Sequence, residues 1–215
     1  MCGDGGWRGL APRTAEQLAH MGFAVAGVGT KVYLRNFSSL QTPLSFKQLA
    51  NDYVEIAKAA RDYKDLLDAA LKVRGIDTKK PVVLSGWSLG AGYSVLAVAL
   101  STEVKNLVGR LVVISLPIQN ELAWKPTDAI IYVTHGVPRE EIFEATNYMS
   151  KLGPVPFVLI NATDDTMATM KDAQWLFNKV NGPKLLMPVK ANDHRYKGNE
   201  SEFFNTLDQS LRMNV

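Results

Sequence analysis

Cysteine and histidine are scarce in this chain of 215 residues, which has one cysteine, Cys2, and three histidines. A single cysteine excludes an intramolecular disulfide framework and supplies no cysteine cluster for a zinc site. No apolar run approaches the roughly 20 residues that a transmembrane helix requires. The opening Met-Cys-Gly-Asp-Gly-Gly-Trp has neither the basic region nor the apolar core of a signal peptide. We therefore expect no membrane span, and no metal or organic cofactor is implied.

Neither the basic nor the acidic residues are clustered in the sequence. The net charge is +3, and the densest basic pair, Lys79-Lys80, lies in an expected loop before a strand. A nucleic-acid surface normally needs a clustered basic stripe, so we expect no nucleic-acid partner. Hydrophobic residues make up 47% of the chain, and no repeat or linker rich in Pro, Gly or Ser divides it. The sequence predicts one domain over residues 1–215.

The apolar pattern alternates between strand-like and helix-like segments. Strands are expected at residues 23–28, 81–85, 111–116, 129–134, 157–160 and 184–189. Helices are expected at residues 14–21, 46–71, 91–100, 140–152, 170–180 and 202–211, with an irregular loop at 29–43. Ser45, followed three residues later by Gln48, is typical of a capping box at the start of the long helix. This alternation predicts an α/β fold, with a mostly parallel sheet covered by helices on both faces.

Residues 86–90, Gly-Trp-Ser-Leu-Gly, match the pattern G-x-S-x-G. An apolar strand is expected before this segment and a helix of small residues after it, which is the setting of a nucleophile elbow. The two glycines suit such a turn because its backbone passes close to neighbouring chain. The pattern indicates Ser88 as a catalytic nucleophile at a helix N-terminus, where backbone dipoles favour developing negative charge. A plain strand-to-helix turn is the alternative interpretation.

A catalytic serine needs a base, and each of the three histidines is a candidate. His20 ends an expected helix, where a cation suits the terminal carbonyls, so a structural role is favoured. His135 follows an expected strand but precedes any suitable acid. His194 comes just after the last expected strand. His194 alone completes the order serine, acid, histidine that α/β-hydrolases use.

The acid is expected after the strand at 157–160, where Asp164 and Asp165 are adjacent. Its task is to hold the imidazole tautomer and to stabilise the imidazolium that forms. We favour Asp165 from its spacing to the next helix, which leaves Asp164 as a loop or cap residue. Asp193 adjoins the base and is interpreted as a turn residue. Asp4, Asp164 and Asp193 are all expected in loops at the strand ends. They could make the mouth of the site acidic, or they could be ordinary turn and cap residues that face water.

An oxyanion hole needs two preorganised N–H donors. One is expected from Leu89, the residue after the nucleophile, and the other from the Gly-rich loop near the start of the chain. In that loop Asp4 is the first choice and Gly5 the second. No Gly-Lys-Ser/Thr follows the loop, which argues against a phosphate-binding P-loop. Trp7 and Trp87 are candidates for the pocket walls or, equally, for ordinary core aromatics.

These motifs together resemble a known family. The segments that carry the resemblance are residues 3–7 (Gly-Asp-Gly-Gly-Trp), Thr42-Pro43, 86–91, 161–165 and Asp193-His194. They are similar to the bacterial virulence protein family typified by VirJ and the C-terminal half of AcvB, over nearly the whole chain. The resemblance implies an α/β-hydrolase exported to the periplasm that hydrolyses esters, with aminoacylated phospholipid head groups as a plausible substrate class.

This sequence departs from the family pattern at Cys2, where a serine is expected, and at Trp87 within the elbow. A third departure is the upstream segment: in the α/β-hydrolase order a strand precedes the oxyanion loop, and no residues before Cys2 remain to build it. We therefore expect the N-terminal strands of the fold to be missing between 23–28 and 81–85. Three alternatives follow: the natural protein continues upstream, which we favour, the two flanking strands close directly on each other, or another chain supplies the strand. A strand edge left open in this way invites pairing between molecules, so a homodimer is a further expectation.

The leading functional hypothesis is hydrolysis of a small-molecule or lipid-derived carboxylic ester through an acyl-enzyme. Ser88, His194 and Asp165 form the expected triad, and the amides of Leu89 and Asp4 form the expected oxyanion hole. Two alternatives stay open at this point. One is a catalytically silent binding or secretion-accessory protein on the same fold, and the other is an amide or thioester hydrolase that uses the same residues. The sequence alone does not separate ester from amide or thioester cleavage.

Overall fold

The computed structural model describes residues 1–37, 43–72, 82–122 and 142–213, and its main sheet is parallel throughout. Its strands are β1 (Val82–Trp87), β2 (Val108–Ile114), β5 (Phe157–Ala162) and β6 (Lys184–Val189), in the order β1-β2-β5-β6. A short antiparallel pair, β3 (Gln119–Glu121) and β4 (Ile142–Glu144), lies apart from this sheet. The parallel α/β architecture predicted from the apolar pattern is confirmed.

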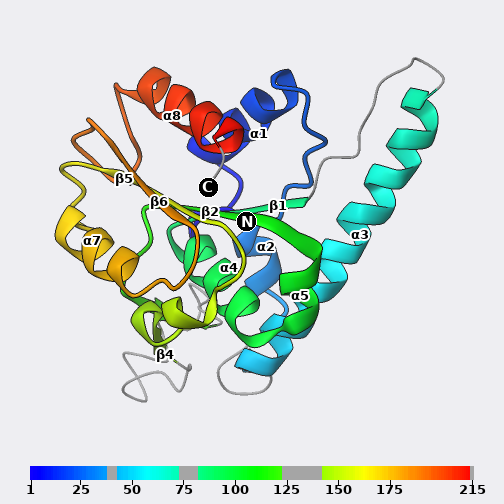
Figure 1. Ribbon diagram of the computed structural model, residues 1–215, viewed down its shortest axis with the longest axis horizontal. Coiled ribbons are helices and arrows are strands. Elements are labelled where there is room, and N and C mark those ends of the chain that lie inside the picture. Colours follow the sequence, from blue (N-terminus) through cyan, green and yellow to red (C-terminus); the bar gives the residue numbers. More distant parts are fainter. Residues whose placement is uncertain (38–42, 73–81, 123–141, 214–215) are drawn as a thin grey trace.

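Helices cover both faces of the main sheet (Figure 1). The first face carries α1 (Leu10–His20) and α8 (Glu200–Arg212). The second face carries α3 (Phe46–Lys72), α4 (Leu89–Leu100), α5 (Thr102–Leu107) and α7 (Met170–Asn178). Alternate residues of β2 supply both cores: Leu111 and Val113 pack toward α4, whereas Val112 and Ile114 pack toward α8. Strands that are apolar on both faces are what a parallel sheet between two helical layers requires.

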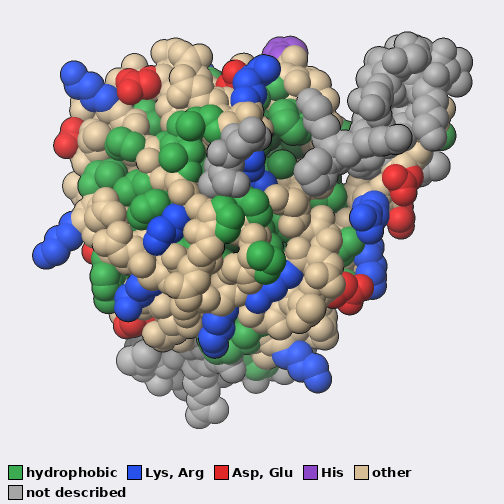
Figure 2. Space-filling view, in the orientation of Figure 1, with side chains coloured by type: hydrophobic (Ala, Val, Ile, Leu, Met, Phe, Trp, Pro, Cys, Tyr) green, Lys and Arg blue, Asp and Glu red, His purple; other side chains and the backbone are tan. Residues whose placement is uncertain are grey.

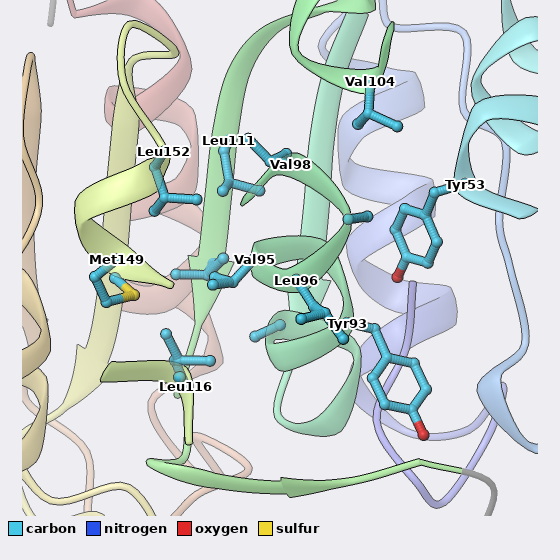
Figure 3. Close-up of a cluster of buried hydrophobic side chains, with 14 of the residues drawn as sticks. Tyr53, Tyr93, Val95, Leu96, Val98, Val104, Leu111, Leu116, Met149 and Leu152 are labelled. Atoms are coloured by element: carbon cyan, nitrogen blue, oxygen red, sulfur yellow. The ribbon is translucent and has the colours of Figure 1, made fainter. Parts of the chain in front are cut away.

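Helix α4 is the centre of the larger core and directly follows the elbow. Residues 90–98 are all buried. A helix that is apolar on every side is stable only when neighbours enclose it. Figure 3 shows Val95 and Val98 of α4 in one buried cluster with Leu111, Met149 and Leu152. This packing fixes the N-terminus of α4, and with it the position of Ser88.

The start of α3 follows the predicted cap. Ser45 Oγ accepts the Gln48 N–H at 3.1 Å, which satisfies one of the free donors of the first turn. The Gln48 side chain does not complete the reciprocal half of the box in the described structure, because its Nε2 donates to Asp52 Oδ1 at 2.7 Å. The capping interpretation therefore identified the helix start correctly but only half of the hydrogen-bonding pattern.

The prediction of a strand at 23–28 is wrong. The segment has no regular secondary structure, and within the described residues no ladder joins it to β1, which is the edge strand of the sheet. Its backbone hydrogen bonds include contacts to α1 and to the start of the chain, where Phe23 N donates to Leu18 O at 3.0 Å and Val28 O accepts the Cys2 N–H at 3.2 Å. Apolar composition alone therefore does not make the segment a strand. Helix α2 (Thr30–Leu34) lies in the predicted irregular loop at 29–43.

The helix predicted at 140–152 is also absent. Its described part consists of β4, which pairs with β3, followed by the 3₁₀ turns Ala145–Asn147 and Met149–Lys151. Ala145 N donates to Ile118 O at 2.7 Å, so this backbone is bound to a distant segment rather than to its own helix. The strand predicted at 129–134 lies outside the described residues.

Basic and acidic side chains are interspersed on the face that Figure 2 shows. Within the described residues, none of the helices is both long and apolar enough to span a bilayer.

Candidate active site

Ser88 occupies a sharp turn between β1 and α4. Its backbone has φ 54° and ψ −121°, a left-handed conformation that is strained for a residue with a side chain. The turn is tight enough that a Cβ on Gly86 would lie 2.2 Å from Gly90 O, and a Cβ on Gly90 would lie 2.4 Å from Cys2 O. Both glycines of the motif are therefore required by close approach. This is the elbow geometry that the sequence predicted.

His194 and Asp165 are in direct contact beyond the carboxyl ends of β5 and β6. His194 Nδ1 lies 2.7 Å from Asp165 Oδ2, and the Asp165 side chain is fully buried. The His194 side chain is 11% exposed. Of the two adjacent carboxylates, only Asp165 is placed to orient the imidazole, because Asp164 is exposed.

The second oxygen of Asp165 is held by the loop that follows. Asp165 Oδ1 accepts the N–H groups of Met167 at 2.8 Å and Ala168 at 2.9 Å. Asn161 closes the same loop by donating Nδ2 to Ala168 O at 2.8 Å. Burial by itself raises the pKa of Asp165, but the hydrogen bonds from His194, Ala168 and Met167 outweigh it and leave the pKa below its ordinary value.

This lowered pKa fixes the tautomer of the histidine. An ionised carboxylate can only accept hydrogen bonds, so His194 Nδ1 must carry the proton and donate it to Asp165. In a neutral imidazole, Nε2 is then left with a free lone pair. His194 Nε2 is buried and has no hydrogen-bond partner in the structure, Ser88 Oγ included. A buried acceptor without a partner is costly, so Nε2 is the atom of this side chain that is open to a hydrogen bond from an incoming group.

The Gly-rich loop near the start of the chain lies beside Ser88. A Cβ on Gly3 would lie 3.4 Å from Ser88 Cβ, and Gly6 N donates to Gly3 O at 3.0 Å, which closes a turn over residues 3–6. Inside this turn the Gly5 N–H donates to Asp4 Oδ1 at 2.8 Å and is therefore occupied. Within the described residues, the backbone N–H groups of Asp4 and Leu89 have no hydrogen-bond acceptor.

Two contacts that the sequence did not indicate hold the histidine segment. The indole N–H of Trp87 donates to His194 O at 3.3 Å, and the two rings lie 5.8 Å apart between centroids. Tyr196, buried and with φ 56°, places its hydroxyl 2.9 Å from Ser115 Oγ, and Ser115 itself has φ 48°. Such contacts between residues 81 or more apart in the chain leave no signal in local spacing.

The other candidate residues from the sequence form no hydrogen bond to the side chains of His194 and Asp165 in the described structure. Asp193 Oδ1 accepts the N–H groups of Arg195 and Lys197 at 3.0 Å each, so Asp193 is a turn residue, as predicted. Trp7 is 45% exposed, and its ring lies against Gly27 rather than in the core. His20 is exposed in the last turn of α1, and His135 lies outside the described residues.

Cys2 is buried away from solvent, and its sulfur accepts the Thr30 N–H at 3.3 Å. Thr30 Oγ1 in turn donates to Cys2 O, so the cysteine and Thr30 form a closed buried pair. Over the described ranges, no group of three or more Cys, His, Asp or Glu side chains is arranged to hold a metal ion.

Comparison with protein families gives two matches that together span most of the chain. A family described as "Bacterial virulence protein (VirJ)" matches residues 1–125, more than half of the chain, and this part contains the Gly-rich loop and the elbow. A second family, "PhoPQ-activated pathogenicity-related protein", matches residues 128–213, which contain Asp165 and His194. No curated protein matches the chain.

Solved structures are similar to the chain at low sequence identity. A structure of LipS and LipT, two metagenome-derived lipolytic enzymes, is 11% identical with a TM-score of 0.54, over 94% of this chain and 86% of that one. MGS-MChE2, an α/β-hydrolase from the metagenome of lagoon sediments at Mar Chica, Morocco, is 16% identical with a TM-score of 0.48, over 83% and 73%. The fold common to such neighbours is that of the α/β-hydrolases.

Proposed function

Because the chain belongs to the bacterial virulence protein (VirJ) family and has the α/β-hydrolase fold, we propose that it is a serine hydrolase that cleaves a carboxylic ester. The observation that carries the proposal is the pairing of His194 with buried Asp165, which leaves Nε2 unpartnered. The histidine segment is held to the elbow by Trp87, the residue before Ser88, through its indole N–H. A fold kept only for binding has no need of a charged carboxylate buried against an imidazole, since burying a charge is costly.

In the proposed reaction Ser88 Oγ attacks the ester carbonyl carbon, and His194 Nε2 accepts the hydroxyl proton. Asp165 stays ionised and stabilises the imidazolium that forms. Collapse of the tetrahedral intermediate breaks the bond to the alcohol, which leaves with the proton from Nε2. Water then attacks the acyl-Ser88 ester with His194 again as base, and the acid product and free Ser88 result.

The negative oxygen of the tetrahedral intermediate needs two N–H donors. Leu89 is the first residue of α4, where the dipole of the helix favours negative charge. Asp4 supplies the second donor in this proposal, because its N–H is free whereas that of Gly5 is bound to the Asp4 carboxylate. Asp4 thus takes part through its backbone, and its side chain stabilises the turn that presents the N–H.

We propose aminoacylated lipid head groups as the substrate class, with the periplasm as the compartment, on the resemblance to the VirJ and AcvB proteins. An aminoacyl ester carries a cationic amine close to the scissile bond. Asp164 is the exposed carboxylate next to Asp165, and in this proposal it is the group that meets such an amine. Asp4 and Asp193 are less available, because their carboxylates are bound by backbone N–H groups. The preference for a cationic ester therefore depends on Asp164.

A panel of chromogenic acyl esters, run with the wild-type chain and with Ser88→Ala, tests the proposal. The panel includes matched pairs with and without an α-amino group on the acyl part, together with the corresponding anilide and thioester. We expect ester turnover that Ser88→Ala abolishes, and a higher kcat/KM for the amino esters that Asp164→Asn reduces. Turnover unaffected by Ser88→Ala would refute the proposal. If no panel member were turned over, the result would favour a catalytically silent binding protein. If the anilide or the thioester were cleaved faster than the ester, the result would favour an amide or thioester hydrolase.

A further inference from the structure

The segment that carries His194 is irregular and depends on contacts that hold it against the nucleophile. Residues 190–199, between β6 and α8, contain no helix or strand. His194 Nε2 has no hydrogen bond to Ser88 Oγ, so the two groups do not set each other's position. A misplacement of about 1 Å between reacting groups can slow a reaction about 10²-fold. The contacts that fix the histidine segment relative to the elbow therefore matter for the rate.

Trp87 connects the elbow with the histidine segment. It is the last residue of β1, it pairs with Ile114 of β2, and Ser88 follows it directly. Its indole N–H donates to His194 O at 3.3 Å, so the main chain of the histidine is bound. The indole and imidazole rings lie 5.8 Å apart between centroids with 30° between their planes, which is within the range of aromatic contacts. Trp87 thus contacts both the main chain and the ring of the base.

A second connection joins the same two segments through the end of β2. Ser88 N donates to Ile114 O at 2.9 Å. Oγ of the next residue, Ser115, lies 2.9 Å from the hydroxyl of Tyr196, two residues after His194. The elbow and the histidine segment are therefore both attached to β2, and the Trp87 contact closes these attachments into a ring. Loss of the indole N–H opens that ring at the histidine itself.

We propose that Trp87 is a positioning residue that keeps His194 Nε2 in register with Ser88. Asp165 fixes the tautomer of the imidazole, whereas Trp87 fixes where the ring lies relative to the elbow. The catalytic consequence rests on the proposed ester hydrolysis, but the contact itself does not. The other role that the sequence allowed, a wall of the substrate pocket, would make Trp87 a binding residue, and the two roles predict different kinetics.

Two replacements at position 87 remove the N–H donor and keep an aromatic ring. One is Trp87→Phe, and the other is 3-benzothienylalanine, introduced by codon suppression, which has a sulfur in place of the N–H and almost the same shape. For a chromogenic ester we expect each to lower kcat about tenfold and to leave KM within about twofold, because the loss falls on the chemical step. Trp175→Phe is the matched control, since Trp175 is exposed on α7, and it should change neither constant. Circular dichroism verifies that each variant folds.

A second readout does not depend on catalysis. The chain has three histidines, so in a sample labelled with ¹⁵N-histidine the Nδ1–H that His194 donates to Asp165 is identified by its loss in His194→Ala. In both position-87 variants we expect this proton to exchange with water about fivefold faster or more, because a less tightly held segment opens more often. Trp175→Phe should leave the exchange rate as it is in the wild-type chain.

Three results would overturn the proposal: unchanged exchange in both position-87 variants, a raised KM with unchanged kcat, which is the result for a pocket wall, or an equal loss in Trp175→Phe. A wild-type chain that hydrolyses no ester would refute the proposed function instead, and the exchange rates would still decide whether Trp87 holds the histidine.

Discussion

Asp164 and Asp165 are adjacent in the chain but have opposite environments. Asp165 is buried, accepts two backbone N–H groups and contacts His194, whereas Asp164 is exposed. We therefore expect the two carboxylates to have different roles, because the environment of a carboxylate decides whether it stays charged and what it can contact. The lowered pKa of Asp165 keeps it charged at neutral pH, which is the condition for stabilising an imidazolium.

This difference predicts unequal effects of two isosteric substitutions. Asp165→Asn should lower kcat for ester hydrolysis by about 10³-fold or more, because the amide no longer selects the tautomer with a free Nε2. His194→Ala should have a similar effect, since the members of a triad act as one unit. Asp164→Asn should leave kcat on a neutral ester within about twofold. If Asp164→Asn were the crippling change in steady-state kinetics, the two carboxylates would have exchanged roles.

Single residues of the candidate site could be chosen from the sequence where a motif or a chain order constrains them. Ser88 follows from the elbow pattern, and His194 and Asp165 follow from the order of the triad. Trp87, Ser115 and Tyr196 could not be found as supports of the histidine segment in this way. Their roles depend on contacts between distant segments and, at Ser115 and Tyr196, on positive φ angles that side chains rarely adopt.

At the scale of elements, the β1–α4 junction depends on the absence of two side chains. A methyl group on Gly86 would meet Gly90 O at 2.2 Å, so backbone would have to move. We expect Gly86→Ala to lower the free energy of unfolding by about 2 kcal/mol or more, as overpacking does. Gly5→Ala is the control, because no atom lies within 4 Å of the added methyl group. Denaturant unfolding measures both variants, and equal stability losses would contradict the close approach.

The segment after β6 is held to the segment after β2 by the Tyr196–Ser115 hydrogen bond. Tyr196→Phe leaves a buried hydroxyl without this partner and should cost about 1–3 kcal/mol of stability. In Ser115→Ala/Tyr196→Phe both hydroxyls are removed together, so the loss should be smaller than the sum of the two single losses. Additive losses in this double-mutant cycle would show that the two hydroxyls do not interact.

Elements were predictable where apolar periodicity and a local cap or turn agreed. β6 and α8 were predicted nearly at their observed bounds, and α3 began at its Ser45 cap. The predictions at 23–28 and 140–152 failed for one common reason. Whether an apolar segment becomes a strand depends on the ladder that it can join: β4 pairs with β3, whereas 23–28 belongs to neither of the described sheets.

For the whole molecule, the parallel sheet brings the site residues together from distant parts of the chain. Ser88 follows β1, Asp165 follows β5 and His194 follows β6, and the carboxyl ends of these strands lie on one edge of the sheet.

The most direct test of the account is the covalent labelling of Ser88 by a fluorophosphonate probe, read by intact mass and peptide mapping. Only a serine whose proton a nearby base can accept reacts at a useful rate. We expect one label per chain, on Ser88, with labelling lost in Ser88→Ala and strongly slowed in His194→Ala. Labelling that persists in Ser88→Ala, or an unmodified wild-type chain that remains folded throughout, would contradict the assignment of Ser88 as an activated nucleophile.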